Sequence, residues 1–401
     1  MTMKKDIKNL INEMNAKDTT IPQIVIEKNA LQYITSYLNE KQYKNVVLVV
    51  DEKTKQAAGD ALEKQLSQTD IHATMVILKP NKHRQVIADE LTVMQLFTEV
   101  TEGTDVVFAV GSGTIHDVVR FVGNKMRIPF ISVPTAASVD GFTSKGAPLI
   151  FRGFKQTIQT ASPIAVFADI NVLKQAPQEM TAAGFGDMVG KYTSLLDWKI
   201  SSLIADEPYS KLAADLTKES LETCVKNVRE IADRSDKGIT ILIEALIQSG
   251  LVMLVLDFSR PASGSEHHLS HYWEMDLLKR DAKQLLHGEK VGVATAIIID
   301  LYKQLITHFD IKSVPQDSDL GSTFKDNWDE IKEMMSELPN SAYIRNMLES
   351  VGGATTPEAL NIDPTLVSRS LNEAFHLRDR CTGLFLTNQF KKEPITYPFE
   401  R

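Results

Sequence analysis

Cysteine, excess basic charge and long apolar stretches are all scarce in this chain. Its 401 residues include only two cysteines, Cys224 and Cys381, too few and too far apart for a disulfide framework, so we expect a reducing compartment. The net charge of −8 argues against nucleic acid as the main partner. The N-terminus is charged and lacks the apolar core of a signal peptide, and the longest apolar run, residues 250–256, is too short to cross a bilayer. These absences predict a cytoplasmic protein with no nucleic-acid or membrane partner.

The first part of the chain alternates between short apolar runs and helix-length segments. The runs show no polar alternation, as expected for strands buried on both faces of a parallel sheet. They lie at residues 46–50, 73–78, 105–110, 128–133 and 164–167. Helical patterns, such as those at residues 53–68 and 86–99, separate them. This alternation predicts an α/β nucleotide-binding domain with a mostly parallel, doubly wound sheet over residues 1–177.

Helical patterns dominate after residue 177. They cover residues 178–203, 211–233, 239–258, 281–309, 323–338 and 341–351, and strand-like runs are nearly absent. The sequence therefore predicts an all-α domain over residues 178–401. A chain of this length is too long for one compact core, and the cleft between two domains is the default ligand site.

Two loops that follow expected strands have the chemistry of ligand binding. The first is the turn Gly111-Ser112-Gly113, which leads into a helical pattern and resembles phosphate-binding turns, although other tight turns use the same glycines. The second, residues 134–144, is rich in small hydroxyl residues, and its alternative interpretation is a plain turn. Asp51 ends a strand well before the glycines, so the order differs from the Rossmann fingerprint. Its carboxylate binds a ribose, caps a helix, or does both.

Histidines gather in one short window. Of the nine in the chain, His267, His268, His271 and His287 lie between residues 264 and 292. His267 and His271 are four residues apart, which places both rings on one face of a helix. Upstream, Asp187 stands among glycines near an expected helix start, where it caps that helix or approaches another segment. A carboxylate and two imidazoles with an open position form a typical catalytic metal site, so the pattern favours a metal over ordinary core histidines.

Taken in order, these motifs resemble the polyol dehydrogenase branch of the iron-type alcohol dehydrogenase, glycerol dehydrogenase and dehydroquinate synthase superfamily. Within it, the sequence is most similar to the bacterial, arabinose-operon-associated sn-glycerol-1-phosphate dehydrogenases. The resemblance covers roughly residues 20–300 and implies a dehydroquinate synthase-like fold. It implies metal ligands at Asp187, His267 and His287, and substrate contacts at Asp140, Asp187 and His271, of which Asp140 and His271 are the catalytic residues. The NAD(P) contacts that it implies are Asp51, Gly111, Ser112, Gly113, Thr114, Ile115, Thr135, Ala136, Ala137, Ser138 and Ser144.

The resemblance also implies an activity. A homodimeric enzyme would transfer hydride between a nicotinamide and the C2 carbonyl of dihydroxyacetone phosphate, giving sn-glycerol 1-phosphate for phospholipid precursor synthesis. NAD and NADP both stay open, because Asp51 favours a free ribose hydroxyl and Lys53 could receive a 2′-phosphate. The candidates for the substrate phosphate are Arg260, Lys290 and Lys191.

The metal and the exact reaction class have alternatives. Zinc, nickel and iron all accept an Asp/His/His ligand set, and we favour nickel because the bacterial form of this family is associated with it. A glycerol dehydrogenase would carry a His-Asn-Gly motif in place of residues 264–268, and a dehydroquinate synthase-type lyase would have a glutamate in place of Asp187. A metal- or nucleotide-sensing protein without turnover is the non-enzyme alternative.

Overall fold

A six-stranded parallel sheet forms the first half of the chain in the computed structural model, which describes residues 2–315 and 318–399. The strand order is β1-β8-β5-β4-β2-β3. The strands are β1 (Gln23–Glu27), β2 (Asn45–Val50), β3 (His72–Ile77), β4 (Val106–Gly111), β5 (Phe130–Pro134) and β8 (Ala165–Asp169). The five predicted strands are confirmed, whereas β1, a half-buried strand at the sheet edge, was not predicted.

Apolar side chains on both faces of the sheet explain why its strands read as continuous hydrophobic runs. In β2, Val46, Leu48 and Val50 enter one core, whereas Val47 and Val49 enter the other. The first core is closed by α2 (Ile34–Lys41) and α4 (Asp60–Leu66), which continues from α3 (Glu52–Thr54) through a π-helical turn at Lys55–Gly59. The second core is closed by α5 (Glu90–Glu99) and α6 (Gly113–Met126). The doubly wound arrangement is therefore confirmed.

The strand order reverses between β2 and β4. From β2 the chain passes to β3 on one side, then to β4 and β5 on the other. In open α/β sheets, ligands bind beyond the carboxyl ends of the strands at such a switch point. Asp51 follows β2 and Ser112 follows β4, so both lie at this position.

A hairpin that the sequence patterns did not predict lies outside the sheet. Its strands are β6 (Gly146–Phe151) and β7 (Phe154–Gln159), which pair antiparallel. They are joined at Arg152 and Gly153, both with positive φ. The backbone N–H of Lys155 on β7 donates to the sulfur of Met275 at 3.4 Å, so the hairpin reaches the helical half.

Helices form the rest of the described chain, and no described residue after Asp169 lies in a strand. They are α7 (Ile170–Gln175), α8 (Gln178–Val189), α9 (Lys191–Ala205), α10 (Lys211–Lys226), α11 (Val228–Ala232), α12 (Asp236–Leu256), α13 (Ser265–Lys279), α14 (His287–His308), α15 (Asp319–Asp326), α16 (Trp328–Glu337), α17 (Ser341–Ser350), α18 (Pro364–Glu373) and α19 (Gly383–Phe390). Short 3₁₀ turns lie at Ala30–Tyr33, Arg260–Ala262, Ile311–Ser313, Glu358–Leu360 and Ala374–Leu377.

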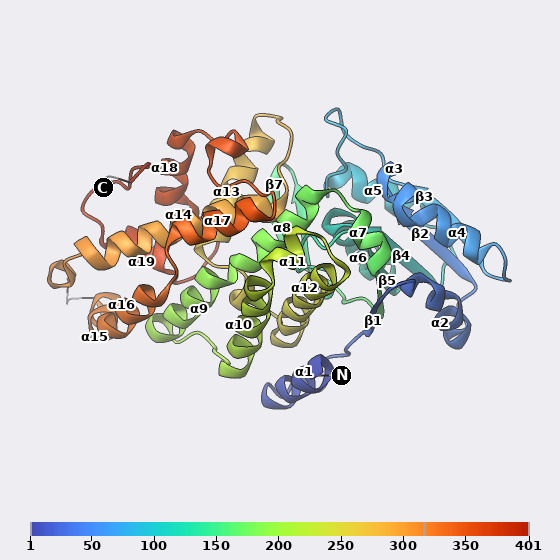
Figure 1. Cartoon of the computed structure of the whole chain (residues 1–401), viewed down its shortest axis with the longest axis horizontal. Coiled ribbons are helices and arrows are strands. Elements are labelled where there is room, and N and C mark those ends of the chain that lie inside the picture. The colour runs from blue at the N-terminus through green and yellow to red at the C-terminus, as the bar shows by residue number, and fades with distance from the viewer. Residues whose placement is uncertain (1, 316–317, 400–401) are drawn as a thin grey trace.

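Some predicted helix bounds differ from those in the structure. The stretch 178–203 forms two helices that meet at Gly190, and 211–233 and 323–338 also divide in two. The predicted helix 281–309 begins only at His287, because residues before it form a loop in which Gln284 exchanges hydrogen bonds with Gln85. The division at residue 177 stays a prediction. The first helix, α1 (Thr2–Glu13), packs its Ile7 and Leu10 into the helical core and lies below α12 in Figure 1.

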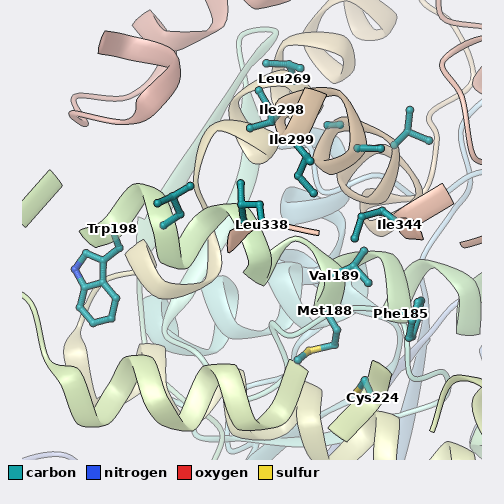
Figure 2. Close-up of a cluster of buried hydrophobic side chains, with 14 of the residues drawn as sticks. Phe185, Met188, Val189, Trp198, Cys224, Leu269, Ile298, Ile299, Leu338 and Ile344 are labelled. Atoms are coloured by element: carbon teal, nitrogen blue, oxygen red, sulfur yellow. The ribbon is translucent and has the colours of Figure 1, made fainter. Parts of the chain in front are cut away.

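The helical core holds α8 firmly in place. Figure 2 shows Phe185, Met188 and Val189 of α8 in this core, together with Ile298 of α14. Asp187 lies between them in sequence and is also fully buried. The helix α12 is long and apolar enough to cross a membrane, with a mean hydropathy of 2.2, but 72% of that window is buried inside the protein. It therefore serves as a core helix here.

Candidate metal and cofactor site

One cavity of about 1800 Å³ runs from the switch point of the sheet to the helical half. Its lining begins at Asp51 and Ser112, beyond β2 and β4, and continues along the loop after β5. It ends among His267, His271 and His287, on α13 and α14. Most residues predicted for the cofactor and the metal thus line a single continuous space, whereas Asp187 is fully buried and is not part of its lining.

The glycine turn presents free backbone donors to this cavity. Ser112 precedes α6 in an extended conformation and makes no side-chain capping bond, so no side chain caps the first N–H groups of the helix. Ser112, Gly113 and Thr114 line the cavity. Gly111 and Ile115 do not, because they are buried behind the turn, where a Cβ on Gly111 would lie 2.4 Å from Cδ1 of Ile115.

Asp51 caps a helix, which is one of the two roles that its position suggested, and the ribose contact stays a prediction. Its Oδ1 accepts from the backbone N–H groups of Lys53 and Thr54, at 2.9 and 2.8 Å, and its own N–H donates to Oγ1 of Thr54. This is a capping box at the start of α3. Asp51 also lines the cavity, so its second oxygen is available for a ribose hydroxyl.

The loop after β5 supplies small groups to the same space. Thr135, Ala136 and Ser138 line the cavity, whereas Ala137 is buried behind it. The hydroxyl of Ser138 is buried and has no partner among the described residues, so it is free to bind a ligand. Ser144 also lines the cavity, but its Oγ accepts from Arg120 at 3.1 Å.

Asp187, His267 and His287 come together from three different helices. Their candidate ligand atoms all lie within 4.8 Å of one another. Nε2 of His267 is 3.2 Å from Nε2 of His287 and 3.8 Å from Oδ1 of Asp187. Burial lowers the pKa of both histidines well below 6.5, so both rings are neutral, as a metal ligand must be. One carboxylate and two imidazoles fit a divalent metal of the zinc or nickel type.

Glycines allow the backbones that carry these ligands to approach closely. A Cβ on Gly288 would lie 1.7 Å from the carbonyl oxygen of Ala183, and a Cβ on Gly186 would lie 2.2 Å from that of Gly288. Only glycine fits at either position. The start of α14 therefore rests directly on α8, next to Asp187 and His287.

Glu266, which the sequence interpretation did not single out, orients one of these ligands. Its Oε1 accepts from Nδ1 of His267 at 2.6 Å and from the backbone N–H of Gly264 at 2.6 Å. Its Oε2 accepts from the hydroxyl of Thr193 at 2.6 Å. Burial raises the pKa of Glu266, whereas these donors favour its ionised form. With the ring proton on Nδ1, Nε2 of His267 directs a lone pair at the candidate metal position.

Lys191 joins Asp187 to Asp140. Its buried ammonium lies 2.7 Å from Oδ2 of Asp140 and 3.2 Å from Oδ1 of Asp187. Burial alone would lower the pKa of Lys191, but the two carboxylates raise it above its ordinary value, so the ammonium stays charged. Asp140 also accepts from the hydroxyl of Ser249 at 2.8 Å, and its backbone N–H donates to Asp187 at 3.0 Å. Both aspartates are thereby fixed in position by hydrogen bonds.

His271 lies one helical turn after His267 and lines the cavity. Its ring centre is 6.2 Å from that of His267 and 5.9 Å from that of His287. Arg378 donates to its Nε2 at 3.0 Å, so the neutral ring carries its proton on Nδ1. This Nδ1 lies 3.9 Å from Oε2 of Glu274 and has no hydrogen-bond partner among the described residues. His268 is fully buried and does not line the cavity, in agreement with its lack of an implied role.

Of the three residues predicted to bind the substrate phosphate, the structure places only one in the cavity lining. Lys191 is buried between the aspartates, and Arg260 is paired with Glu207; neither lines the cavity. Lys290 lines it and lies 2.9 Å from Glu274, which Lys155 also contacts at 2.8 Å. Lys155 and Arg378 had no local sequence signal, because only the fold brings them beside His271, whereas Glu274 lies one helical turn after His271 on α13.

Known proteins are similar to this chain in sequence and in fold. The profile of the family described as iron-containing alcohol dehydrogenase matches residues 25–177. A protein of Geobacillus thermodenitrificans named glycerol-1-phosphate dehydrogenase (NAD(P)+) is 48% identical over 93% of this chain and 93% of its own length. The Bacillus subtilis protein of the same name is 43% identical over 94% of each chain. A probable glycerol dehydrogenase structure from Sinorhizobium meliloti covers 88% of this chain and 89% of its own, with a TM-score of 0.63 at 17% identity, and so shares the fold.

Proposed function

Because the chain belongs to the glycerol-1-phosphate dehydrogenase family, we propose that it interconverts dihydroxyacetone phosphate and sn-glycerol 1-phosphate with NAD or NADP. In the reducing direction, hydride from the nicotinamide adds to C2 and a proton adds to the carbonyl oxygen. The product would serve glycerophospholipid precursor synthesis. The observation that carries the proposal is one cavity with a free helix N-terminus at one end and the cluster Asp187, His267 and His287 at the other.

At the cofactor end, the proposed contacts are those that line the cavity. Ser112, Gly113 and Thr114 would hold the pyrophosphate with backbone N–H groups at the start of α6. The second oxygen of Asp51 would accept from a ribose hydroxyl. Lys53 also lines the cavity, which supports use of both NAD and NADP. Gly111, Ile115 and Ala137 would shape the two loops from behind.

At the substrate end, Asp187, His267 and His287 would hold one divalent metal. When bound, the metal supplies Lewis acidity and the nicotinamide supplies the redox chemistry. Asp140, fixed by Lys191 and Ser249, would accept a hydrogen bond from a substrate hydroxyl. His271 would donate a hydrogen bond from Nδ1–H to a substrate oxygen and so stabilise the negative charge that develops there.

We favour nickel over zinc, since the sequence resembles the bacterial branch of the family. The oxygen and nitrogen donors accept either ion, so reconstitution decides the question. Protein stripped with a chelator and reloaded with each metal should recover more activity with nickel. Greater recovery with zinc would overturn this choice.

A stereospecific assay tests the activity itself. Metal-loaded protein should oxidise sn-glycerol 1-phosphate with NAD or NADP and leave the 3-phosphate unchanged. Oxidation of glycerol at comparable efficiency would instead indicate a polyol dehydrogenase, and elimination without net cofactor reduction would indicate a lyase. The variant His287→Ala should lose bound metal and turnover together.

We also propose that the chain acts in the cytoplasm as a homodimer. The free, buried state of Cys224 and Cys381 supports a reducing compartment. Light scattering on the purified protein tests the dimer, and a mass equal to one chain would exclude it.

A further inference from the structure

Arg378 occupies a position in the cavity for which the proposed function so far gives no role. It follows the 3₁₀ turn Ala374–Leu377 and is separated from His271 by 107 positions in sequence. Its Nη2 donates to Nε2 of His271 at 3.0 Å, and its Nη1 donates to Oγ of Ser263 at 2.8 Å. All three residues line the cavity. The fold therefore places a guanidinium against the histidine next to the candidate metal ligands.

The buried carboxylate of Glu266 favours the charged form of this guanidinium but forms no ion pair with it. Among the residues that the structure describes, Arg378 makes hydrogen bonds to Ser263 and His271 but no ion pair. The two lysines nearby, Lys155 and Lys290, share the single carboxylate of Glu274. Of these three cations, Arg378 is thus the one that no carboxylate of the described residues contacts in an ion pair. A partly buried, unpaired charge is costly, and an anionic ligand removes that cost.

The distances suit a short phosphorylated substrate. Arg378 bonds to a ring whose centre is 6.2 Å from that of His267 and 5.9 Å from that of His287. In a triose phosphate, only one carbon and the ester oxygen separate the phosphorus from the C2 centre. A substrate whose C2 oxygen lies at the metal ligands therefore has its phosphate within reach of Arg378. The planar fork of arginine matches the oxygens of a phosphate.

We propose that Arg378, with the hydroxyl of Ser263, binds the phosphate of the substrate and makes the enzyme select phosphorylated over free trioses. This inference rests on the proposed function of the same site. It replaces Arg260 and Lys191, which do not line the cavity, as the phosphate-binding candidates. Lys155 and Lys290 add to the positive potential, but Glu274 holds both in ion pairs.

The test compares Arg378→Ala with wild type and with Arg369→Ala. Arg369 lies on α18, is half exposed, pairs with Asp276, and does not line the cavity. We expect Arg378→Ala to raise KM for sn-glycerol 1-phosphate by about 10- to 100-fold. Loss of Arg378 also removes a hydrogen bond to His271, so activity with unphosphorylated dihydroxyacetone should fall as well, but by at least about tenfold less than activity with the phosphorylated substrate. Arg369→Ala should resemble wild type with both substrates.

Thermal protection by inorganic phosphate gives a second readout that does not need turnover. Phosphate should raise the Tm of the wild type and of Arg369→Ala, and should have much less effect on Arg378→Ala. If wild type does not oxidise sn-glycerol 1-phosphate, the proposed function fails, and phosphate protection still decides whether Arg378 binds the anion. If wild type is active but Arg378→Ala keeps its KM and its phosphate protection, the inference is overturned. An equal loss of activity with the phosphorylated and the unphosphorylated substrate would also overturn the inference, because Arg378 would then only orient His271.

Discussion

Replacing Gly288 with alanine tests whether the close packing of α8 against α14 holds the candidate metal ligands together. The added Cβ would lie 1.7 Å from the carbonyl oxygen of Ala183 and 2.5 Å from its carbonyl carbon. Both are backbone atoms, so no side-chain rotation relieves the overlap. The two helices would have to separate by more than about 1 Å to restore ordinary contact.

This displacement acts directly on the candidate ligands, because His287 precedes the substituted residue and Asp187 lies on the opposing helix. Overpacking of this kind costs about 1–3 kcal/mol in the free energy of unfolding. A misplacement of about 1 Å can lower the rate by about 100-fold. We therefore expect Gly288→Ala to retain much less metal after dialysis and to show a lower Tm and a lower kcat.

Metal content by atomic emission, thermal unfolding and turnover with added metal measure these effects. The matched control is Gly141→Ala, because a Cβ at position 141 meets no atom within 4 Å. This control should keep its metal content and its Tm. A Gly288→Ala protein with wild-type metal content and Tm would refute the argument from backbone packing.

Three further substitutions test other parts of the site and fold. Glu266→Gln should weaken metal binding by about 10- to 100-fold, because Glu266 orients His267, and a competitive chelator titration measures this; unchanged affinity would remove Glu266 from the site. Asp51→Asn keeps a capping side chain but loses the charge, so we expect KM for NAD to rise by about tenfold and that for NADP to rise less. Burial lowers the pKa of His116 to about 3. Below about pH 6.5 the unfolded chain alone binds this proton, so the free energy of unfolding falls by about 1.4 kcal/mol per pH unit as the pH decreases; urea titrations at several pH values should show a shallower decline for His116→Gln, and identical slopes would contradict the assignment.

The elements that could be predicted from sequence are those whose signal is local. Strands β2, β4, β5 and β8 are buried on both faces, and their continuous apolar runs identified them. The edge strand β1 is only half buried, so its residues lack such a run. The hairpin of β6 and β7 lies outside the sheet, and its turn at Arg152 and Gly153 gives only a weak signal. Helix 281–309 was predicted too long because the bonds between Gln85 and Gln284 are tertiary.

The site, too, contains residues that local sequence patterns predict and residues that only the tertiary fold brings together. The histidine window and Asp187 pointed to a metal before any fold was known, and the resemblance chose His267 and His287 as the ligands among the histidines. Glu266 could have been predicted from the sequence. An acidic residue beside a ligand histidine can accept a hydrogen bond from the ring nitrogen that does not bind the metal. Arg378 was not, because it lies 107 positions from His271 and has no motif of its own. Local patterns thus identified the metal end of the cavity, whereas the end proposed for the phosphate depends on the tertiary fold.

The three candidate metal ligands are fixed in two different ways. Asp187 accepts from Lys191 and from the backbone of Asp140, and these hydrogen bonds orient its side chain. His267 is oriented in the same manner by Glu266. His287 contacts only the rings of His267 and His271 and has no carboxylate or lysine partner among the described residues, so its position depends on the backbone at the start of α14. Packing against α8 therefore positions His287, whereas hydrogen bonds position Asp187 and His267. Substitutions that disturb the backbone contact between α8 and α14 should lower metal affinity as much as removal of a hydrogen-bond partner of Asp187 or His267.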